Sequence, residues 1–184
     1  DSVGSYNEGR WGAWDSIRNR VLYQDNDRLR AYDPAKSIGS RVVAIDDGSQ
    51  PSDSRNRFCS GAFDSKRNRL VGACILSSGT PTLEGFDLGT VPIKRKTFLS
   101  SAPWPSWTTA PGFLYDPISD KYVLWPNGGA KLYIIDPVSF AVSTLVGSGV
   151  DPGIPQSPYA GTWGRFAYVP GDDIYLLSHK VQGQ

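Results

Sequence analysis

PGFLYDPISDKYVLWPNGGAKLYIIDPVSFAV, residues 111–142, contains short apolar runs separated by turn residues. The runs cover 112–115, 122–125 and 132–135, and a fourth run follows at 141–145. Short runs rich in β-branched and aromatic residues, divided by Asp-Pro and Asn-Gly-Gly turns, are typical of a tight antiparallel meander. The stretch therefore predicts one four-stranded sheet.

The first turn of this sheet recurs along the chain. WDSIRNRV begins at Trp14, FDSKRNRL at Phe63 and YDPISDKY at Tyr115, and YVPGDDIY from Tyr168 is a degenerate fourth copy. Each full copy has an aromatic residue, an aspartate, four turn residues, a cation and an apolar residue. The aspartates that mark the period of roughly 50 residues are Asp15, Asp64 and Asp116.

A second aspartate recurs at the end of the third run of each copy. Because both aspartates repeat in every copy, we expect them to have structural roles, as acceptors for backbone N–H groups in turns. A residue with a specific function would normally occur in one copy alone. The aspartates of this second set are Asp33, Asp87 and Asp136.

Four strands in about 50 residues is the repeat of a kelch-type propeller blade. With these motifs the chain resembles the kelch and galactose-oxidase-central-domain class of β-propellers, in particular plain bacterial members without an enzymatic elaboration. The resemblance covers nearly all of residues 11–177 and implies an all-β fold of four-stranded antiparallel blades. We expect one propeller segment over 1–184, with blades at about 11–45, 57–98 and 110–145 and a partial blade at 163–177.

The predicted blades do not form a closed ring. Closed propellers carry four to eight blades, and closure removes the exposed sheet edges. Three and a half blades therefore indicate an incomplete propeller and favour a piece of a longer chain. The alternative is that the N-terminal residues complete the last blade, although 1–9 are too polar for a central strand.

Composition narrows the class of protein. The formal net charge is +1 with both signs interspersed, so no basic surface for nucleic acid is predicted. No apolar run reaches the roughly 18 residues of a membrane span. The 20 glycines and 14 prolines among 184 residues suit an all-β domain with many turns.

The two cysteines, Cys59 and Cys74, fall in the second copy of the repeat. Opposed residues of its first hairpin have numbers that add up to 133, as Asp64 and Arg69 do, and the two cysteines share that sum. Directly opposed residues are close enough for a disulfide, which predicts a Cys59–Cys74 bond. The alternative is two buried thiols. A bond would favour an exported protein, extracellular or periplasmic.

Catalysis is not predicted within these residues. A copper oxidase of the galactose-oxidase kind needs several histidines and a cross-linked tyrosine and cysteine, whereas the chain has one histidine, His179. Two cysteines without nearby histidines do not make a zinc site. We therefore expect no catalytic residues, no metal and no cofactor here.

The connections that differ between the copies are the better place to look for a functional site. Three long connections, 46–56, 100–110 and 147–162, join one predicted blade to the next, and in propellers this face usually binds the ligand. Aromatic rings on proline-stiffened loops offer flat apolar surface for a sugar ring or a peptide. The alternative is that these rings fold inward and cover the central channel. The candidate ligand-binding residues are Trp104, Trp107, Tyr159 and Trp163.

Three classes of function follow. The favoured one is a non-catalytic binding module of an exported propeller, with a glycan or a protein as its ligand. The second is the propeller part of an enzyme whose active site lies outside this segment. The third is an assembly protein that associates with itself through open blade edges.

Overall fold

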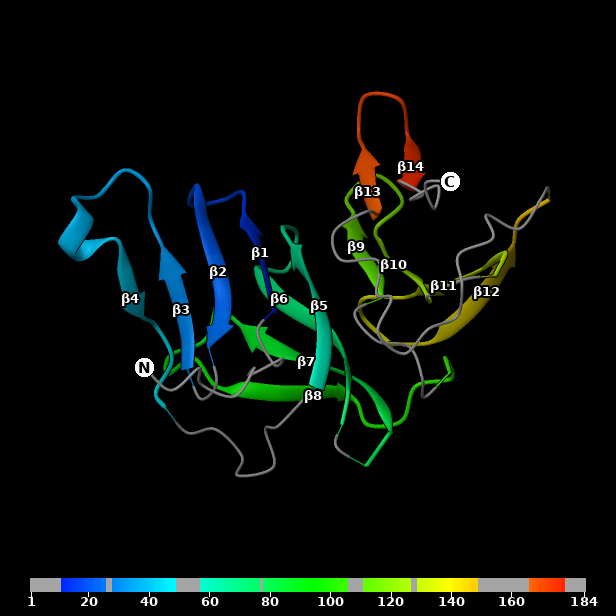
Figure 1. The fold of residues 1–184 in the computed structure, drawn as a ribbon, viewed down its shortest axis with the longest axis horizontal. Coiled ribbons are helices and arrows are strands. Elements are labelled where there is room, and N and C mark those ends of the chain that lie inside the picture. The colour runs from blue at the N-terminus through cyan, green and yellow to red at the C-terminus, as the bar shows by residue number, and fades with distance from the viewer. Residues whose placement is uncertain are drawn as a thin grey trace, which may run out of the picture.

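A computed structural model describes residues 11–25, 28–48, 57–76, 78–105, 111–126, 129–148 and 166–177. These residues form strands connected by turns, with one short 3-10 helix at Ile38–Ser40. Every sheet is an antiparallel meander in chain order (Figure 1). The prediction of an all-β fold with four-stranded blades is confirmed.

The strands group into blades 1 to 4. Blades 1 to 3 have four strands each in the described residues, and blade 4 has two. Blade 1 is β1 (Trp11–Asp15), β2 (Arg20–Asp25), β3 (Arg28–Tyr32) and β4 (Val42–Ala44). Blade 2 is β5 (Arg57–Asp64), β6 (Arg69–Ile75), β7 (Pro81–Asp87) and β8 (Arg95–Leu99). Blade 3 is β9 (Gly112–Asp116), β10 (Lys121–Trp125), β11 (Lys131–Ile135) and β12 (Val142–Val146), and blade 4 is β13 (Phe166–Val169) and β14 (Ile174–Leu177).

The first strands of the blades lie next to one another: β1 contacts β5, β5 contacts β9, and β9 contacts β13. The remaining strands of each blade fan outward from this inner row (Figure 1). This is the radial arrangement of a β-propeller. The described sheets form an open arc, with blade 1 at one end and blade 4 at the other.

Pairing in each first hairpin follows the repeat found in the sequence. The aspartate at the end of the first strand is opposite the cation at the start of the second in all three full copies. In blade 4, Val169 and Ile174 occupy these two places. The last turn residue has a positive φ in all four hairpins, a conformation that asparagine and aspartate tolerate: Asn19, Asn68, Asp120 and Asp173.

The first-turn aspartates cap their own turns. Asp116 Oδ1 accepts hydrogen bonds from the backbone N–H groups of Ile118 and Ser119, at 2.8 and 3.2 Å. Asp15 and Asp64 accept bonds of the same kind in their own turns. The second set of aspartates does so where the third strand ends. The predicted structural role of both sets is confirmed.

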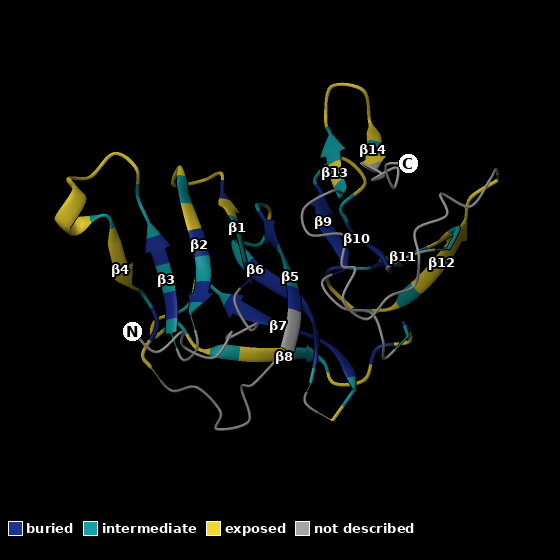
Figure 2. Ribbon diagram, in the orientation of Figure 1, coloured by how far each residue is buried: buried dark blue, intermediate teal, exposed yellow. Residues whose placement is uncertain are grey.

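Two apolar cores lie between successive blades, and the outermost strands β4 and β12 are exposed (Figure 2). The core between blades 1 and 2 includes Trp11, Leu22, Leu29, Ala31, Cys59, Phe63, Leu70, Cys74, Phe86 and Leu88. The core between blades 2 and 3 includes Ala62, Val71, Ala73, Ile75, Leu83, Ala102, Trp104, Phe113, Tyr115, Tyr122, Leu124, Tyr133 and Ile135.

Tyrosine hydroxyls connect the aspartate of one blade to the blade that follows. Tyr122 Oη of blade 3 donates to Asp64 Oδ2 of blade 2 at 2.9 Å, in the buried core. Tyr175 Oη of blade 4 donates to Asp116 Oδ2 of blade 3 at 2.7 Å. Blade 2 has Leu70 at the corresponding position, and there is no hydroxyl to reach blade 1. The hydrogen bond thus recurs at two of the three junctions.

Turn residues also pair across the junctions. Arg67 of blade 2 makes a bidentate pair with Asp120 of blade 3, with N–O distances of 2.8 and 2.7 Å. This pair lowers the pKa of Asp120, mainly through the hydrogen bonds from Arg67. One blade earlier, Arg18 Nη1 donates to Asn68 Oδ1 at 2.8 Å. At these two junctions the third turn residue of one blade therefore contacts the fourth turn residue of the next.

Replacing Tyr122 with Phe tests the contribution of the buried inter-blade hydrogen bond. Removing the hydroxyl leaves the buried Asp64 carboxylate with one donor fewer, and we expect a loss of about 2 kcal/mol in the free energy of unfolding. Urea denaturation measures it. Tyr133→Phe is the matched control, because the ring of Tyr133 packs edge-on against Trp104. Equal losses in the two variants would contradict a special role for the inter-blade bond.

The Asp116–Tyr175 bond predicts a pH dependence. Burial raises the pKa of Asp116, but hydrogen bonds from Ser119, Tyr175 and the turn N–H groups outweigh burial and lower the pKa from 3.8 to about 2. A carboxylate with a lowered pKa in the folded state stabilises the protein above its unfolded pKa, and this stabilisation is lost as the pH falls. Stability should therefore fall from pH 3.8 towards pH 2.

Tyr175→Phe should make this fall shallower, because it brings the pKa of Asp116 in the folded state closer to its unfolded value. The free energy of unfolding, measured with urea at several pH values between 4 and 2, tests the slope. Tyr133→Phe is the control, since the ring of Tyr133 packs against Trp104 instead. An unchanged slope in Tyr175→Phe would show that the hydroxyl does not set the Asp116 pKa.

Candidate functional site

A disulfide joins the first two strands of blade 2. Cys59 on β5 and Cys74 on β6 are bonded, with their Cα atoms 4.2 Å apart. The predicted bond is confirmed, and no cysteine remains free. Both residues belong to the core between blades 1 and 2. The bond therefore fixes the face of blade 2 that packs against blade 1.

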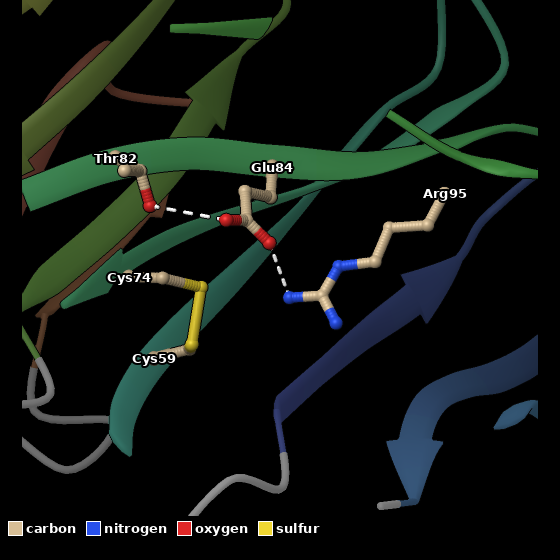
Figure 3. Close-up of a disulfide and its surroundings, with 5 residues drawn as sticks. All are labelled: Cys59, Cys74, Thr82, Glu84 and Arg95. Carbon is tan, nitrogen blue, oxygen red and sulfur yellow. Dashed lines mark hydrogen bonds and ion pairs between the residues drawn. A yellow bond between two sulfur atoms is a disulfide. The ribbon is translucent and has the colours of Figure 1, made fainter. Parts of the chain in front are cut away.

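A buried ion pair lies beside this disulfide (Figure 3). Arg95 at the start of β8 donates through Nη2 to Glu84 Oε2, and only 3% of the Arg95 side chain and 9% of the Glu84 side chain are exposed. Thr82 Oγ1 is 3.5 Å from the other oxygen of Glu84. Thr82 is opposite Cys74 across the sheet, so the ion pair and the disulfide share one face.

Blade 1 faces this ion pair with Trp11 and Gln24, which are opposite each other on β1 and β2 and are both buried. The Trp11 ring lies on Gly72, where an added Cβ would be 3.0 Å from ring carbons. Gly72 is in turn opposite Glu84. The glycine therefore lets the indole approach the strand that carries the ion pair. Trp11, Gln24, Thr82, Glu84 and Arg95 are called the polar cluster below.

Three atoms of the polar cluster are buried without a hydrogen-bond partner in the part of the chain that the structure describes: Trp11 Nε1, Gln24 Oε1 and Arg95 Nη1. Two of them are donors and one is an acceptor. Leaving such a group unsatisfied costs about 1–3 kcal/mol. Unsatisfied buried groups in native proteins are associated with functional sites or with a bound water or ion. The polar cluster is therefore the candidate functional site.

The polar cluster is specific to one junction. Strand register identifies the blade 3 positions that correspond to Gln24, Glu84 and Arg95. These positions carry uncharged side chains, namely Trp125, Tyr133 and Val142. The polar side chains therefore do not belong to the shared architecture of the blades. The repeat pattern of the sequence does not predict the cluster, although Glu84 interrupts the apolar third run of blade 2.

Trp104, one of the predicted ligand-binding residues, lies in the core. Its side chain is 3% exposed and its ring meets Tyr133 edge-on, with centroids 6.2 Å apart. The backbone N–H of Ala102 donates to Pro81 O at 2.8 Å and holds the loop against β7. Trp104 therefore agrees with the alternative in which the aromatic rings fold inward. Its ring is buried and does not form a surface platform. Trp104 is buried because its ring fills the apolar space between blades 2 and 3, which the loop covers.

The other predicted ligand-binding residues, Trp107, Tyr159 and Trp163, lie outside the described residues. His179 does as well. Among the residues that are described, no group of three or more His, Cys, Asp or Glu side chains is arranged to hold a metal ion. The described part of the chain also contains no helix long and apolar enough to cross a membrane.

No protein-family model matches the chain. Among curated proteins, stearoyl-[acyl-carrier-protein] 9-desaturase 1 (chloroplastic) of Oryza sativa, in the indica and japonica subspecies, is 30% identical over 95 residues. The match covers 50% of this chain and 24% of the desaturase. The chain thus spans about a quarter of the length of the curated relatives it matches.

Two solved structures are similar to parts of the fold. Virginiamycin B lyase from Staphylococcus aureus, a β-propeller, has a TM-score of 0.44 and 12% identity, over 78% of this chain and 43% of that one. A protein of unknown function from Bacteroides thetaiotaomicron has a TM-score of 0.32 and 13% identity, over 75% and 43% of the two chains. The chain spans less than half of either structure, and these similarities assign no activity.

Removing the disulfide tests its contribution to stability. The double variant Cys59→Ala/Cys74→Ala should lose about 3 kcal/mol in the free energy of unfolding, because the bond restricts the unfolded chain. Urea denaturation with and without dithiothreitol measures the effect. The reductant should destabilise the wild type and leave the double variant unchanged. If the double variant were as stable as the wild type, the bond would have no role in holding blade 2 together.

Proposed function

We propose that the chain is a non-catalytic, ligand-binding β-propeller module of the kelch type, and that its ligand is a glycan. The binding site is the polar cluster at the junction of blades 1 and 2. Trp11 is the first residue of β1 and Gln24 is the last but one of β2, so both lie at the end of blade 1 that carries the β2–β3 loop. Propellers commonly use that end for ligands.

The observation that carries this proposal is the unsatisfied donor–acceptor set. Trp11 Nε1 and Arg95 Nη1 donate, and Gln24 Oε1 accepts. A sugar hydroxyl both donates and accepts, so it can pair with either kind of atom in this set. A carboxylate only accepts, so it would satisfy the two donors and leave Gln24 Oε1 without a partner. The chemistry of the cluster therefore favours a neutral glycan over a carboxylate ligand.

Trp107, Tyr159 and Trp163 complete the proposal as aromatic platforms for the apolar faces of sugar rings. The disulfide supports an exported location, extracellular or periplasmic, because such bonds persist in oxidising compartments. A peptide ligand is the competing outcome, since stiff aromatic loops also suit peptide side chains.

Calorimetric measurement of binding to a panel of soluble neutral oligosaccharides tests this function. Trp11→Phe keeps the aromatic ring and removes the N–H, and Gln24→Leu removes the acceptor. Each change should weaken binding of the selected oligosaccharide by about tenfold or less, the effect of one hydrogen bond. Ser143→Ala on the exposed strand β12 is the control and should bind as the wild type does.

Two results would contradict the proposal. In the first, an oligosaccharide binds but both variants keep the wild-type affinity, which would remove the polar cluster from the site. In the second, no oligosaccharide binds and a peptide library yields a ligand, which would make the chain a protein-binding module. Urea denaturation of each variant shows whether a loss of binding comes from a loss of folding.

A further inference from the structure

The Trp11 indole of blade 1 lies on two glycines of blade 2. Gly61 on β5 and Gly72 on β6 are directly opposite each other. A Cβ added at Gly61 would be 2.9 Å from Trp11 Cε3, and a Cβ added at Gly72 would be 3.0 Å from Cε2, Cζ2 and Cη2 of the same ring. The two glycines therefore provide a surface without side chains for the indole, and they are called the glycine seat below.

The contacts with the glycine seat also give the direction of the indole. Cε3 lies against Gly61 of β5, whereas Cε2, the carbon bonded to Nε1, lies against Gly72 of β6. In the sheet β6 is between β5 and β7, and Gly72 is opposite Glu84 of β7. The edge of the ring that carries Nε1 is therefore turned away from β5 and towards the strand of the Glu84–Arg95 ion pair.

Larger side chains border the glycine seat on both sides along the strands. Residues two apart in a strand share one face of the sheet, and two positions from the glycines in one direction is the Cys59–Cys74 disulfide. Two positions from Gly72 in the other direction is Leu70, which is opposite Phe86. The ring of Phe86 is 6.3 Å from the Trp11 ring between centroids, and all these residues belong to one buried core. The indole is therefore confined within the plane of the sheet as well as supported from below.

Blade 3 fills the same place with its own side chains. Strand register identifies Phe113 and Leu124 as the counterparts of Gly61 and Gly72, and both are buried in the core between blades 2 and 3. Glycine in the interior of a strand often marks a place where another group approaches closely. The glycine pair is thus not part of the frame that these two blades share, and it occurs at the junction that has the polar cluster.

The direction of the indole matters because Trp11 Nε1 is a donor without a hydrogen-bond partner among the described residues, on a residue that is 4% exposed. A hydrogen bond weakens steeply when the donor is not aimed at the acceptor. Polar groups of a binding site are therefore held by packing that locks the side chain in one orientation. The glycine seat and its borders supply such packing for the Trp11 donor.

We propose that Gly61 and Gly72 are positioning residues, which seat the Trp11 indole so that its Nε1 donor faces the ion pair of the polar cluster. The part of this proposal that concerns ligand binding rests on the function proposed above, whereas the seat can be tested without a ligand. Gly72 is the better residue to change. The nearest atoms to a Cβ added there are all ring carbons, whereas a Cβ added at Gly61 would also be 2.6 Å from the backbone oxygen of Gly12. Alanine suits a strand better than glycine does, so Gly72→Ala should fold.

A proton–nitrogen correlation spectrum tests the seat without a ligand. The chain has six tryptophans, and Trp11→Phe identifies the indole N–H signal of Trp11 by its loss. In Gly72→Ala the added methyl group should displace the ring and shift this signal. Gly39→Ala is the matched control and should leave the signal in place, because nothing lies within 4 Å of a Cβ added there. An unchanged Trp11 signal in Gly72→Ala would overturn the proposal.

Calorimetry with the oligosaccharide selected above separates positioning from packing. In the wild-type background Gly72→Ala should weaken binding by about tenfold or less, the effect of one hydrogen bond. In the Trp11→Phe background the same change should cause no further loss, because the donor that it displaces is already absent. Equal losses in the two backgrounds would overturn the positioning role. If no oligosaccharide binds the wild type, the proposed function fails, while a shifted Trp11 signal in Gly72→Ala would still support the seat.

Discussion

The first-turn carboxylate is the constraint on which the blades depend. Asp15, Asp64 and Asp116 are almost completely buried at the end of each first strand. A buried carboxylate is tolerated only when its oxygens are hydrogen-bonded or paired. Each of these carboxylates accepts hydrogen bonds from the turn N–H groups and from a nearby side-chain donor. At two junctions a tyrosine of the next blade also donates to the carboxylate. One side chain thereby determines the hairpin turn and helps to fix the position of the following blade.

Much of the fold was predictable because it is local and repeated. Strand boundaries, the turn aspartates and the Cys59–Cys74 bond all follow from the pairing within a hairpin, which simple numbering gives. The contacts between blades were not predictable in this way. Whether Trp104 points outward or into the core depends on how two sheets pack, and the pairing of Glu84 with Arg95 beside Trp11 depends on the same geometry. Sequence numbering contains no information about that packing.

The junctions differ in chemistry although the blades share one frame. Aromatic and aliphatic side chains fill the space between blades 2 and 3, whereas an ion pair and an amide lie between blades 1 and 2. An aromatic core needs no partners beyond close packing, and an ion pair out of water needs every donor and acceptor satisfied. At the junction that departs from the shared pattern, three buried side-chain atoms, Trp11 Nε1, Gln24 Oε1 and Arg95 Nη1, have no hydrogen-bond partner among the described residues.

The arrangement of neighbours along the arc has a consequence for cooperativity. Each described blade contacts the blades beside it in the chain, so the stability of the molecule is close to a sum of single-blade and nearest-neighbour terms. Blade 2 has a core on both faces and carries the disulfide, whereas the described strands of blade 4 contact blade 3 alone among the described blades. Within the described residues, opening of blade 4 breaks one junction, while opening of blade 2 breaks two.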